Sequence, residues 1–445
     1  METQTKEKSK KKLAWWKILL IVFLSVVIVF VGFSYGMIRY FVGDTLSFKG
    51  MLSMMSYGGF DLPKGFRNFV LDVDRSYPGL PELLVAEDGT PVTTPEEFAA
   101  RREEMLSLYE TYLYGEIPTD GFEVSFSVEE KGAALDGAAA REQVRITVSS
   151  EYGSNDAMLL IYTPAGPESC GMFIGLNFSG NTAVWDDPQI IPSVCQGDSI
   201  KAGQEAGSWP VDQIIASGYG VATMYYGDWA DDNADTYQDN LLHLFPGRNC
   251  TAYTAWAFGV IRGIDYLEQM EQVDMDVIAT VGHSRLARVS LWAGANDPRI
   301  DLVTGSCGGG LLRSPLFAKI DPDSTSSHWF TNEYFSYEGR DSELPVDIHM
   351  LYALCADRHL YISMGNQDLA SDPVATYDAV QKAKQVWSDI YGMNVIADGT
   401  YDDLVPGVPQ FSEGIAVHAH DGGHAITAED WQYYIQYLEQ YVIRR

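Results

Sequence analysis

The chain has 445 residues, of which 46% are hydrophobic and 20% charged, so it can bury a large core and is neither disordered nor fibrous. It holds 30 Lys and Arg against 61 Asp and Glu, for a net charge of −31. Such acidity opposes binding to a phosphate backbone, so we do not expect nucleic acid as a partner. The five cysteines form no C-x-x-C or Cys/His clip, which argues against a zinc ribbon and leaves room for at most two disulfides.

The N-terminus has its own charge and hydropathy pattern. Residues 1–17 hold six lysines and two glutamates, giving a basic tip of +4 before an acidic remainder of −35. Residues 18–38 carry no charge and as a helix would span about 31 Å, which matches a bilayer core. By the positive-inside rule the basic tip is cytoplasmic. We therefore expect a single-pass anchor in the cell membrane, with the bulk of the chain extracytoplasmic.

A cleaved signal peptide is the alternative interpretation of the same segment, because its basic start would look identical. The apolar run exceeds the ~7–15 residues usual for a signal peptide, and no A-x-A site follows it, so we favour the uncleaved anchor. With cleavage the protein would be secreted. Both interpretations place the globular part outside the cytoplasm.

The chain after the anchor changes character twice. Residues 39–79 are rich in glycine without a sustained period, which predicts a linker or stalk. A helix is predicted over 95–115, with Thr94 as N-cap, Glu97 completing a capping box and Gly115 as the stop. Alternating residues over 121–150 predict a pair of strands.

Short apolar runs then alternate with helical patterns. The runs are MLLIYTP, GMFIGLNF, YGVATMYY, VIATVGH, LVTGSCG, LYISMG and IAVHAH. Continuous hydrophobic strands separated by helices are typical of a parallel sheet that is covered on both faces. We expect an α/β fold, a doubly wound and mostly parallel sheet of the α/β-hydrolase type, which fills residues 80–445 as one domain.

The stretch from Val277 to Ala295 carries the most specific chemistry. A buried strand runs into Gly282-His283-Ser284-Arg285 and directly on into a helix. Such a turn is where a nucleophile elbow exposes a serine hydroxyl above the sheet. The match to G-x-S-x-G is incomplete because Leu286 stands at its last position. The alternative is that Ser284 only caps the helix.

An acid and a base follow the serine in the order that α/β-hydrolases use. Asp368 comes after the run LYISMG, and His424 after IAVHAH, so both lie at the sheet edge where ligands bind. His424 would take the proton of Ser284, and Asp368 would hold the imidazole in the right tautomer. Arg285 would direct its charge at the oxyanion, or else form a salt bridge with one of the many carboxylates.

At this point the chain resembles the glucuronoyl esterases of carbohydrate esterase family fifteen, whose elbow reads G-C/H-S-R-x-G-K. Segments of roughly residues 80–445 follow the family order, among them GLNFSGN, TAWAFGVIRGIDYLE, SCGGG and HAHDGGHAITAEDW. The resemblance implies an α/β-hydrolase that cleaves, without metal or cofactor, the ester between xylan glucuronic acid and a lignin-type alcohol. It also implies Ser284 as nucleophile, Arg285 as oxyanion arginine and His424 as base.

The sequence departs from the family pattern at several positions. Where some members carry the acid, this chain reads Gly305-Ser306-Cys307-Gly308, so Asp368 is the preferred acid and Asp372 the reserve. The family lysine that contacts the uronate is Arg288 here. A tryptophan of the acid loop is Ala370. Two alternatives therefore stay open, a carbohydrate acetyl esterase and a catalytically inactive surface module that binds glycans.

The remaining candidates have weaker support. Trp329 is a candidate for lining a sugar site, with a core role equally compatible. The acidic run 227–239 lacks EF-hand spacing, so a solvated loop near the mouth of the site is favoured over a calcium loop. The other histidines of the elbow and of the later elements are expected to be structural: His283, His349, His418 and His420.

Overall fold

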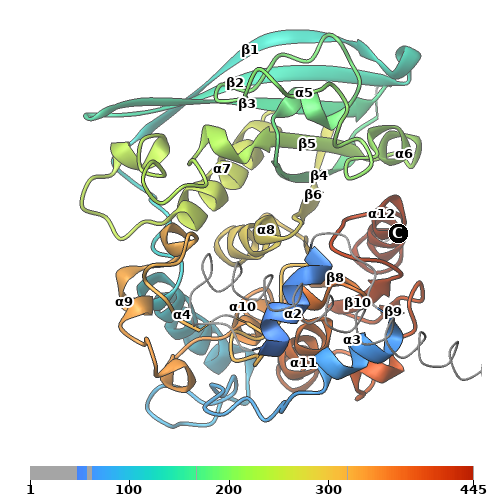
Figure 1. Ribbon diagram of the computed structural model, residues 1–445. Helices are drawn as coiled ribbons and strands as arrows, with labels where there is room; N and C mark the ends of the chain where they lie inside the picture. Colours follow the sequence, from blue (N-terminus) through green and yellow to red (C-terminus); the bar gives the residue numbers. More distant parts are fainter. Residues whose placement is uncertain (1–47, 58–62, 167, 318, 444–445) are drawn as a thin grey trace, which may run out of the picture.

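The computed structural model describes residues 48–57, 63–166, 168–317 and 319–443. Its centre is one ten-stranded sheet with the order β1-β2-β3-β5-β4-β6-β7-β8-β10-β9 (Figure 1). The strands are β1 Glu123–Ala134, β2 Ala139–Ser150, β3 Gly153–Pro164, β4 Cys170–Asn177, β5 Gly220–Tyr225, β6 Val273–Val281, β7 Leu302–Ser306, β8 His359–Gly365, β9 Gln410–Phe411 and β10 Ile415–His420.

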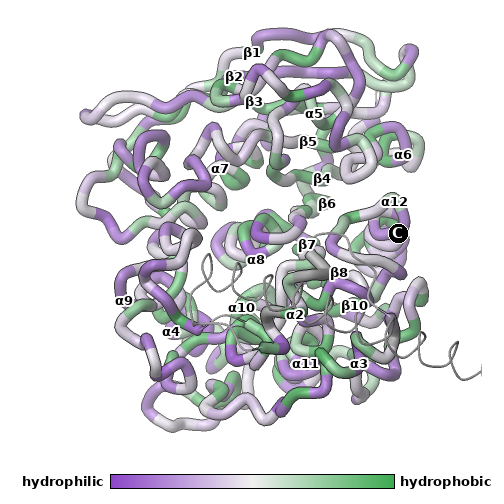
Figure 2. Tube along the Cα trace, in the orientation of Figure 1, coloured by the Kyte–Doolittle hydropathy of each residue, from purple (hydrophilic) through white to green (hydrophobic). Residues whose placement is uncertain are grey.

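The middle of the sheet is parallel, as the continuous apolar runs predict. The neighbours from β5 through β4, β6, β7 and β8 to β10 all pair in parallel, and β4 is buried at every position. Figure 2 shows hydrophobic residues along β4 and β6 and hydrophilic ones along β1 at the edge. Burial on both faces explains why these strands carry no polar alternation.

Antiparallel strands close both ends of the sheet. The predicted strand pair over 121–150 is observed as β1 and β2, joined through the turn Leu135–Gly137. The apolar run MLLIYTP was expected in the parallel set, but it forms β3, which pairs antiparallel with both β2 and β5. The run is apolar because β3 is buried beneath the helices, and burial alone does not set strand direction.

Helices cover both faces of the sheet (Figure 1). One core cluster joins α4, α7, α8, α10 and α11 to one face, and a second joins α6 and α12 to the other. The helices after the N-terminal region are α4 Pro95–Tyr112, α5 Asn181–Val184, α6 Val211–Ala216, α7 Ala252–Leu267, α8 Arg285–Asn296, α9 Asn332–Phe335, α10 Ile348–Ala353, α11 Pro373–Ala383 and α12 Ala428–Tyr437.

The predicted helix over 95–115 is observed as α4, and its start follows the predicted chemistry. The Thr94 side chain accepts a hydrogen bond from the Glu97 backbone, and the Glu97 side chain accepts one from the Thr94 backbone. This capping box satisfies backbone donors that the first helical turn leaves unpaired.

The N-terminal region differs from the predicted linker. Helices α2 Phe48–Tyr57 and α3 Lys64–Leu71 lie within residues 39–79 and pack on the main domain. Both are short, so their apolar spacing gave no sustained period. The predicted anchor at 18–38 and the basic tip lie outside the described residues. Among the residues that are described, no helix has the length and apolarity to cross a membrane.

Candidate active site

Ser284 stands on a strained turn between β6 and α8. Its φ of 58° and ψ of −131° lie where residues with a side chain are rare, which is the mark of a nucleophile elbow. Gly282 is required beside it, because a Cβ there would lie 2.1 Å from the Leu286 carbonyl oxygen. The side chain of Ser284 makes no cap hydrogen bond with α8, so helix capping does not explain this serine.

The departure from the glycine of the elbow motif is compensated on the neighbouring strand. In the family elbow G-C/H-S-R-x-G-K, Ala287 occupies the position of the second glycine, and its methyl group points at the chain that follows β7. A Cβ on Gly308 would lie 2.8 Å from the Ala287 methyl, and one on Gly305 would lie 3.6 Å from it. The methyl group therefore fits because this chain has glycine opposite it.

Asp368 and His424 meet across two neighbouring parallel strands, β8 and β10. The Nδ1 atom of His424 lies 2.7 Å from a carboxylate oxygen of Asp368. Burial acts to raise the pKa of Asp368, but the hydrogen bond and charge of His424 outweigh it and hold that pKa below its usual value. The two loops are also joined by backbone hydrogen bonds from Asn366 to His420 and from Gln367 to Gly422.

Asp372, the reserve candidate for the acid, is engaged elsewhere. It caps α11 by accepting from the Ala375 backbone at 3.2 Å. Its carboxylate also pairs with Arg75 and accepts from the Ser314 hydroxyl. These contacts direct Asp372 away from His424, so the structure places Asp368 alone of the two against the imidazole.

Arg285 is held by Asp232, a residue for which the sequence predicts no role of its own. Its guanidinium forms a salt bridge with Asp232 and lies over the rings of Phe178 and Trp329. The other oxygen of Asp232 accepts from His328 Nε2 at 2.8 Å and from Trp329 Nε1 at 2.7 Å. Asp232 lies in the acidic run 227–239, for which the sequence predicts a solvated loop, because only tertiary contacts distinguish one of its carboxylates from the others.

These residues border one cavity of about 430 Å³ at the carboxyl edge of the sheet. Ser284, Arg285, Arg288 and His424 lie on its wall, together with a second polar group made of Lys319, Asp321, Ser324, Ser326 and Ser371. Six aromatic side chains also line it: Tyr253, Phe317, Trp329, Phe330, Tyr334 and Phe335. Trp329 thus lines the site, as the sequence suggested, while its indole nitrogen is bound to Asp232.

Arg288 and Ala370 line the same cavity. Arg288 Nε donates to the Gly308 carbonyl at 2.8 Å, which fixes the stem and turns the rest of the guanidinium toward the tyrosines of the wall. Ala370 leaves the acid turn without an aromatic ring. The cavity therefore keeps a cation at one expected position and lacks a stacking surface at another.

The other predicted structural histidines lie behind the site. His283 packs on His424 with ring centroids 4.7 Å apart, and burial together with the charge of His424 lowers its pKa to about 3. His418 and His420 both contact Asp430, at 2.7 and 3.1 Å, and His420 Nε2 also lies 3.1 Å from the Gly423 carbonyl. This buried network supports the loop that carries His424.

Two groups in the described residues have potential metal-ligand atoms within 4.8 Å of one another. One consists of Cys307, Asp368 and His424, and the other of His418, His420 and Asp430. In both groups a carboxylate already pairs with an imidazole, so we assign them to hydrogen bonding. The five cysteines are all free thiols in the described structure.

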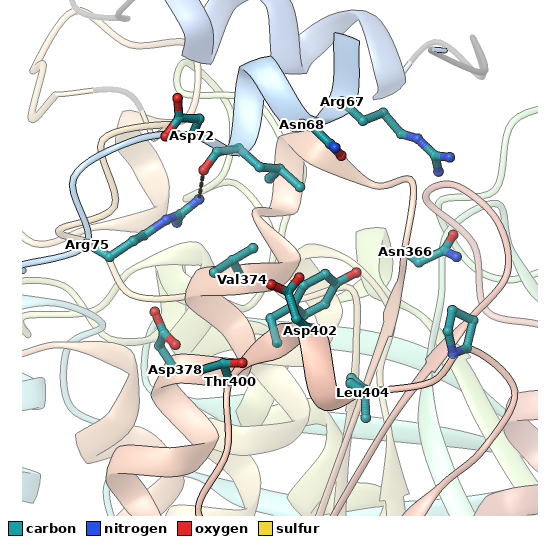
Figure 3. A pocket seen from close by; sticks show the side chains of 13 residues that line it. Arg67, Asn68, Asp72, Arg75, Asn366, Val374, Asp378, Thr400, Asp402 and Leu404 are labelled. Carbon is teal, nitrogen blue, oxygen red and sulfur yellow. Dashed lines mark hydrogen bonds between the residues drawn. The ribbon is translucent and has the colours of Figure 1, made fainter. Parts of the chain in front are cut away.

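A second cavity, of about 660 Å³, lies beside α3 (Figure 3). Arg67 and Asn68 from α3 face Asn366, Thr400 and Asp402 across it. Its lining includes no serine, cysteine or histidine, so it lacks the serine-histidine pair of an α/β-hydrolase. The chemistry therefore belongs to the smaller cavity, around Ser284.

A mixed sheet of this order, with a serine elbow and a histidine-carboxylate pair at its carboxyl edge, defines an α/β-hydrolase. A family model described as glucuronyl esterase, fungi, matches residues 199–391. Carbohydrate esterase MZ0003 of an unknown prokaryotic organism is 32% identical over 409 residues, which cover 85% of this chain and 93% of that protein. A solved CE15 esterase from a marine bacterial metagenome is also 32% identical, with a TM-score of 0.74 over 81% of this chain and 96% of that one. The chain belongs to the glucuronoyl esterases of carbohydrate esterase family 15 and is a carboxylic ester hydrolase.

Two further relatives agree with this assignment. The solved glucuronoyl esterase from Solibacter usitatus is 30% identical with a TM-score of 0.74, over 81% of this chain and 97% of that one. The 4-O-methyl-glucuronoyl methylesterase 1 of Phanerochaete chrysosporium is 29% identical over 69% of this chain and 61% of that protein.

Proposed function

We propose that this enzyme hydrolyses esters of glucuronic acid, most directly the bond between a 4-O-methyl-glucuronoyl group of xylan and an aromatic alcohol. The observation that carries the proposal is the 2.7 Å contact of His424 with Asp368 in the cavity that also holds Ser284 and Arg285. The names of the related glucuronoyl esterases support the acyl group.

In the first half of the reaction, Ser284 Oγ attacks the ester carbonyl carbon while His424 Nε2 takes the hydroxyl proton. A tetrahedral intermediate forms, and its collapse breaks the bond to the alcohol, which leaves with the proton that His424 returns. Asp368 accepts the Nδ1–H bond and so keeps Nε2 directed at the serine. An acyl-enzyme on Ser284 remains.

Arg285 stabilises the oxyanion in this scheme. As the first residue of α8 it offers a backbone N–H that the helix itself leaves without an acceptor, and its guanidinium borders the same cavity. The grip of Asp232 holds the guanidinium in place before the substrate binds. Such preorganisation avoids the cost of orienting a flexible cation during the reaction.

In the second half, water attacks the acyl-enzyme with His424 as general base, and the free uronic acid leaves. The product carries a new carboxylate. In this scheme Arg288 contacts the uronate, which is supported by its bond from Nε to the Gly308 carbonyl and by its position in the cavity lining. The aromatic wall suits an apolar alcohol on the other side of the ester.

A carbohydrate acetyl esterase is the second candidate, favoured by Ala370 alone. Without a stacking ring on the acid turn, the site holds the sugar less firmly. The aromatic wall and Arg288 oppose this candidate, because an acetyl group needs neither. An inactive glycan-binding module is opposed by the aligned histidine-carboxylate pair.

Turnover of three substrates by the purified enzyme tests the proposal. We expect hydrolysis of benzyl and methyl glucuronate, with little release of acetate from acetylated xylan. Replacing Arg288 by Met is expected to raise KM for the glucuronates about tenfold, the cost of one charge-assisted contact, while Arg288→Lys keeps most activity. Turnover of acetylated xylan alone would contradict the glucuronoyl assignment, and no turnover of any ester would favour the binding module.

The place of action is part of the same proposal. The anchor expected at residues 18–38 would hold the enzyme at the outer face of the cell membrane, where polymeric xylan fragments are accessible. Fractionation of cells that make the full chain, with protease added outside, tests it. Degradation of the hydrolase domain in intact cells is expected, and protection of that domain would contradict the orientation.

A further inference from the structure

The N-terminal helices contribute to the catalytic cavity. We call residues 48–57 and 63–77 the strap. Its helix α2 brings Met54 to the wall of the cavity that holds Ser284 and His424. The Met54 side chain is 42% exposed, so it presents an apolar surface at the opening instead of filling the core. The strap lies within residues 39–79, for which the sequence predicts a linker or stalk.

An apolar contact fastens the strap to the turn that carries the triad acid. Leu52 and Val70 of the strap pack with Leu316 and Leu369, and all four are buried. Leu369 directly follows Asp368, and α2 and α3 both lie against the turn Leu369–Ser371. The position of Met54 is therefore tied to the position of the acid.

Polar contacts secure the rest of the strap. Arg75 forms its salt bridge with Asp372, and the Tyr77 hydroxyl donates to Asp378 at 2.6 Å. Lys49 joins the two helices, because it donates to the Asp72 carbonyl and lies 4.7 Å from the centre of the Phe69 ring. These contacts hold α2 and α3 together and fix the strap against the main domain.

The strap borders both cavities. Figure 3 shows Arg67 and Asn68 of α3 turned toward the larger, polar cavity, while α2 presents Met54 to the catalytic one. The acid turn lies between them, with Asn366 lining one cavity and Ala370 the other. The strap thus lines the larger cavity mainly through polar residues and the catalytic cavity through the apolar side chain of Met54.

We infer that Met54 is a specificity-determining residue that contacts the alcohol part of the ester, an inference that rests on the proposed function. Sugars are bound through hydrogen bonds and aromatic faces, and a thioether side chain supplies neither of these well. Methionine adapts its shape to apolar and aromatic groups, which it contacts favourably through sulfur. Phe317 and Phe335 line the same cavity and offer further apolar surface to a ring-bearing alcohol, in a wall that also holds Lys319 and Asp321.

The full chain tests the inference with two esters that differ only in their alcohol, benzyl and methyl glucuronate. Met54→Ala is expected to lower kcat/KM for the benzyl ester about fivefold to tenfold, through KM, because part of a side chain's apolar contact is lost. The methyl ester is expected to change less than twofold. Met54→Leu, which keeps the volume, should restore the benzyl preference.

The matched control is Tyr152→Ala, which removes another exposed side chain at the β2–β3 turn, outside the cavity lining. It is expected to leave both esters unchanged. An equal loss on both esters with Met54→Ala, or no loss on either, would overturn the inference while the proposed function stands. A wild-type enzyme that hydrolyses neither glucuronate would instead contradict the proposed function itself.

Discussion

Asp368 and Asp372 stand four residues apart on one loop, yet their carboxylates serve different neighbours. Asp368 lies 2.7 Å from His424 Nδ1, and Asp372 pairs with Arg75 and caps α11. The turn Leu369–Ser371 between them reverses the chain, and Asp372 leaves it with a left-handed φ of 46°. One loop therefore contributes to both the chemistry and the attachment of the strap.

The acid assignment predicts different results for two parallel substitutions. Asp368→Asn is expected to lower kcat about 10³-fold to 10⁴-fold, because the amide no longer holds the tautomer of His424 that accepts the serine proton. Asp372→Asn is expected to lower the free energy of unfolding by about 1–3 kcal/mol with a much smaller effect on kcat. Steady-state kinetics and urea unfolding of both variants measure this. A larger kcat loss in Asp372→Asn would contradict the assignment.

Asp232 is expected to act as a positioning residue for Arg285. Asp232→Asn removes the charge that holds the guanidinium while it keeps an acceptor for Trp329, so kcat should fall about tenfold, less than the loss of an oxyanion donor itself. The neighbouring Asp231→Asn is the control, since that exposed carboxylate accepts only from the nearby Thr236 in the described contacts. KM is expected to stay within about twofold in both variants, in line with a role in the transition state. Equal kcat values for the two variants would contradict the role of Asp232.

The packing of Ala287 against Gly308 predicts a compensating pair. Gly308→Ala places a methyl 2.8 Å from that of Ala287 and is expected to cost about 1–3 kcal/mol of stability through overpacking. Ala287→Gly in the same chain removes the clash and should recover most of the loss. A double-mutant cycle of unfolding free energies measures the coupling. Additive effects would show that the two positions do not compensate each other.

Buried neutral histidines predict how stability depends on pH. Burial lowers the pKa of His349 and of His328 to about 4, and that of His283 to about 3. Their ordinary value is about 6.5, so between these limits the unfolded chain binds more protons than the folded one. Stability is therefore expected to fall as the pH drops from about 7 to 4.5.

The urea midpoint at several pH values in this window measures the effect, and His349→Gln should flatten its slope. His349 suits this test because it lies in α10, away from the cavity lining, and its ring Nε2–H donates to the Pro81 carbonyl at 2.9 Å in the described contacts. His420 opposes the trend, since Asp430 raises its pKa despite burial. A midpoint that rises on acidification would contradict the prediction.

Local patterns in the sequence determined much of the fold and the order of the triad. The apolar runs predicted seven of the strands because a strand buried on both faces must be hydrophobic throughout. The capping box of Thr94 and Glu97 predicted the start of α4 for an equally local reason. Ser284, Asp368 and His424 followed from their positions at strand ends, where an α/β sheet gathers its functional groups.

Tertiary structure decided what depends on distant contacts. The sequence alone could not show which of Asp368 and Asp372 contacts His424. In the structure the turn Leu369–Ser371 packs against the strap, and Asp372 pairs with Arg75 of the strap. Asp368 is the carboxylate that contacts His424. The salt bridge between Asp232 and Arg285 joins two segments that are distant in the sequence, and no local pattern predicts that they meet. The sequence did not predict the position of the strap, because its two short helices bury only a few residues. Their packing depends on Leu369 and Leu316 from distant parts of the chain, and this packing brings Met54 to the cavity.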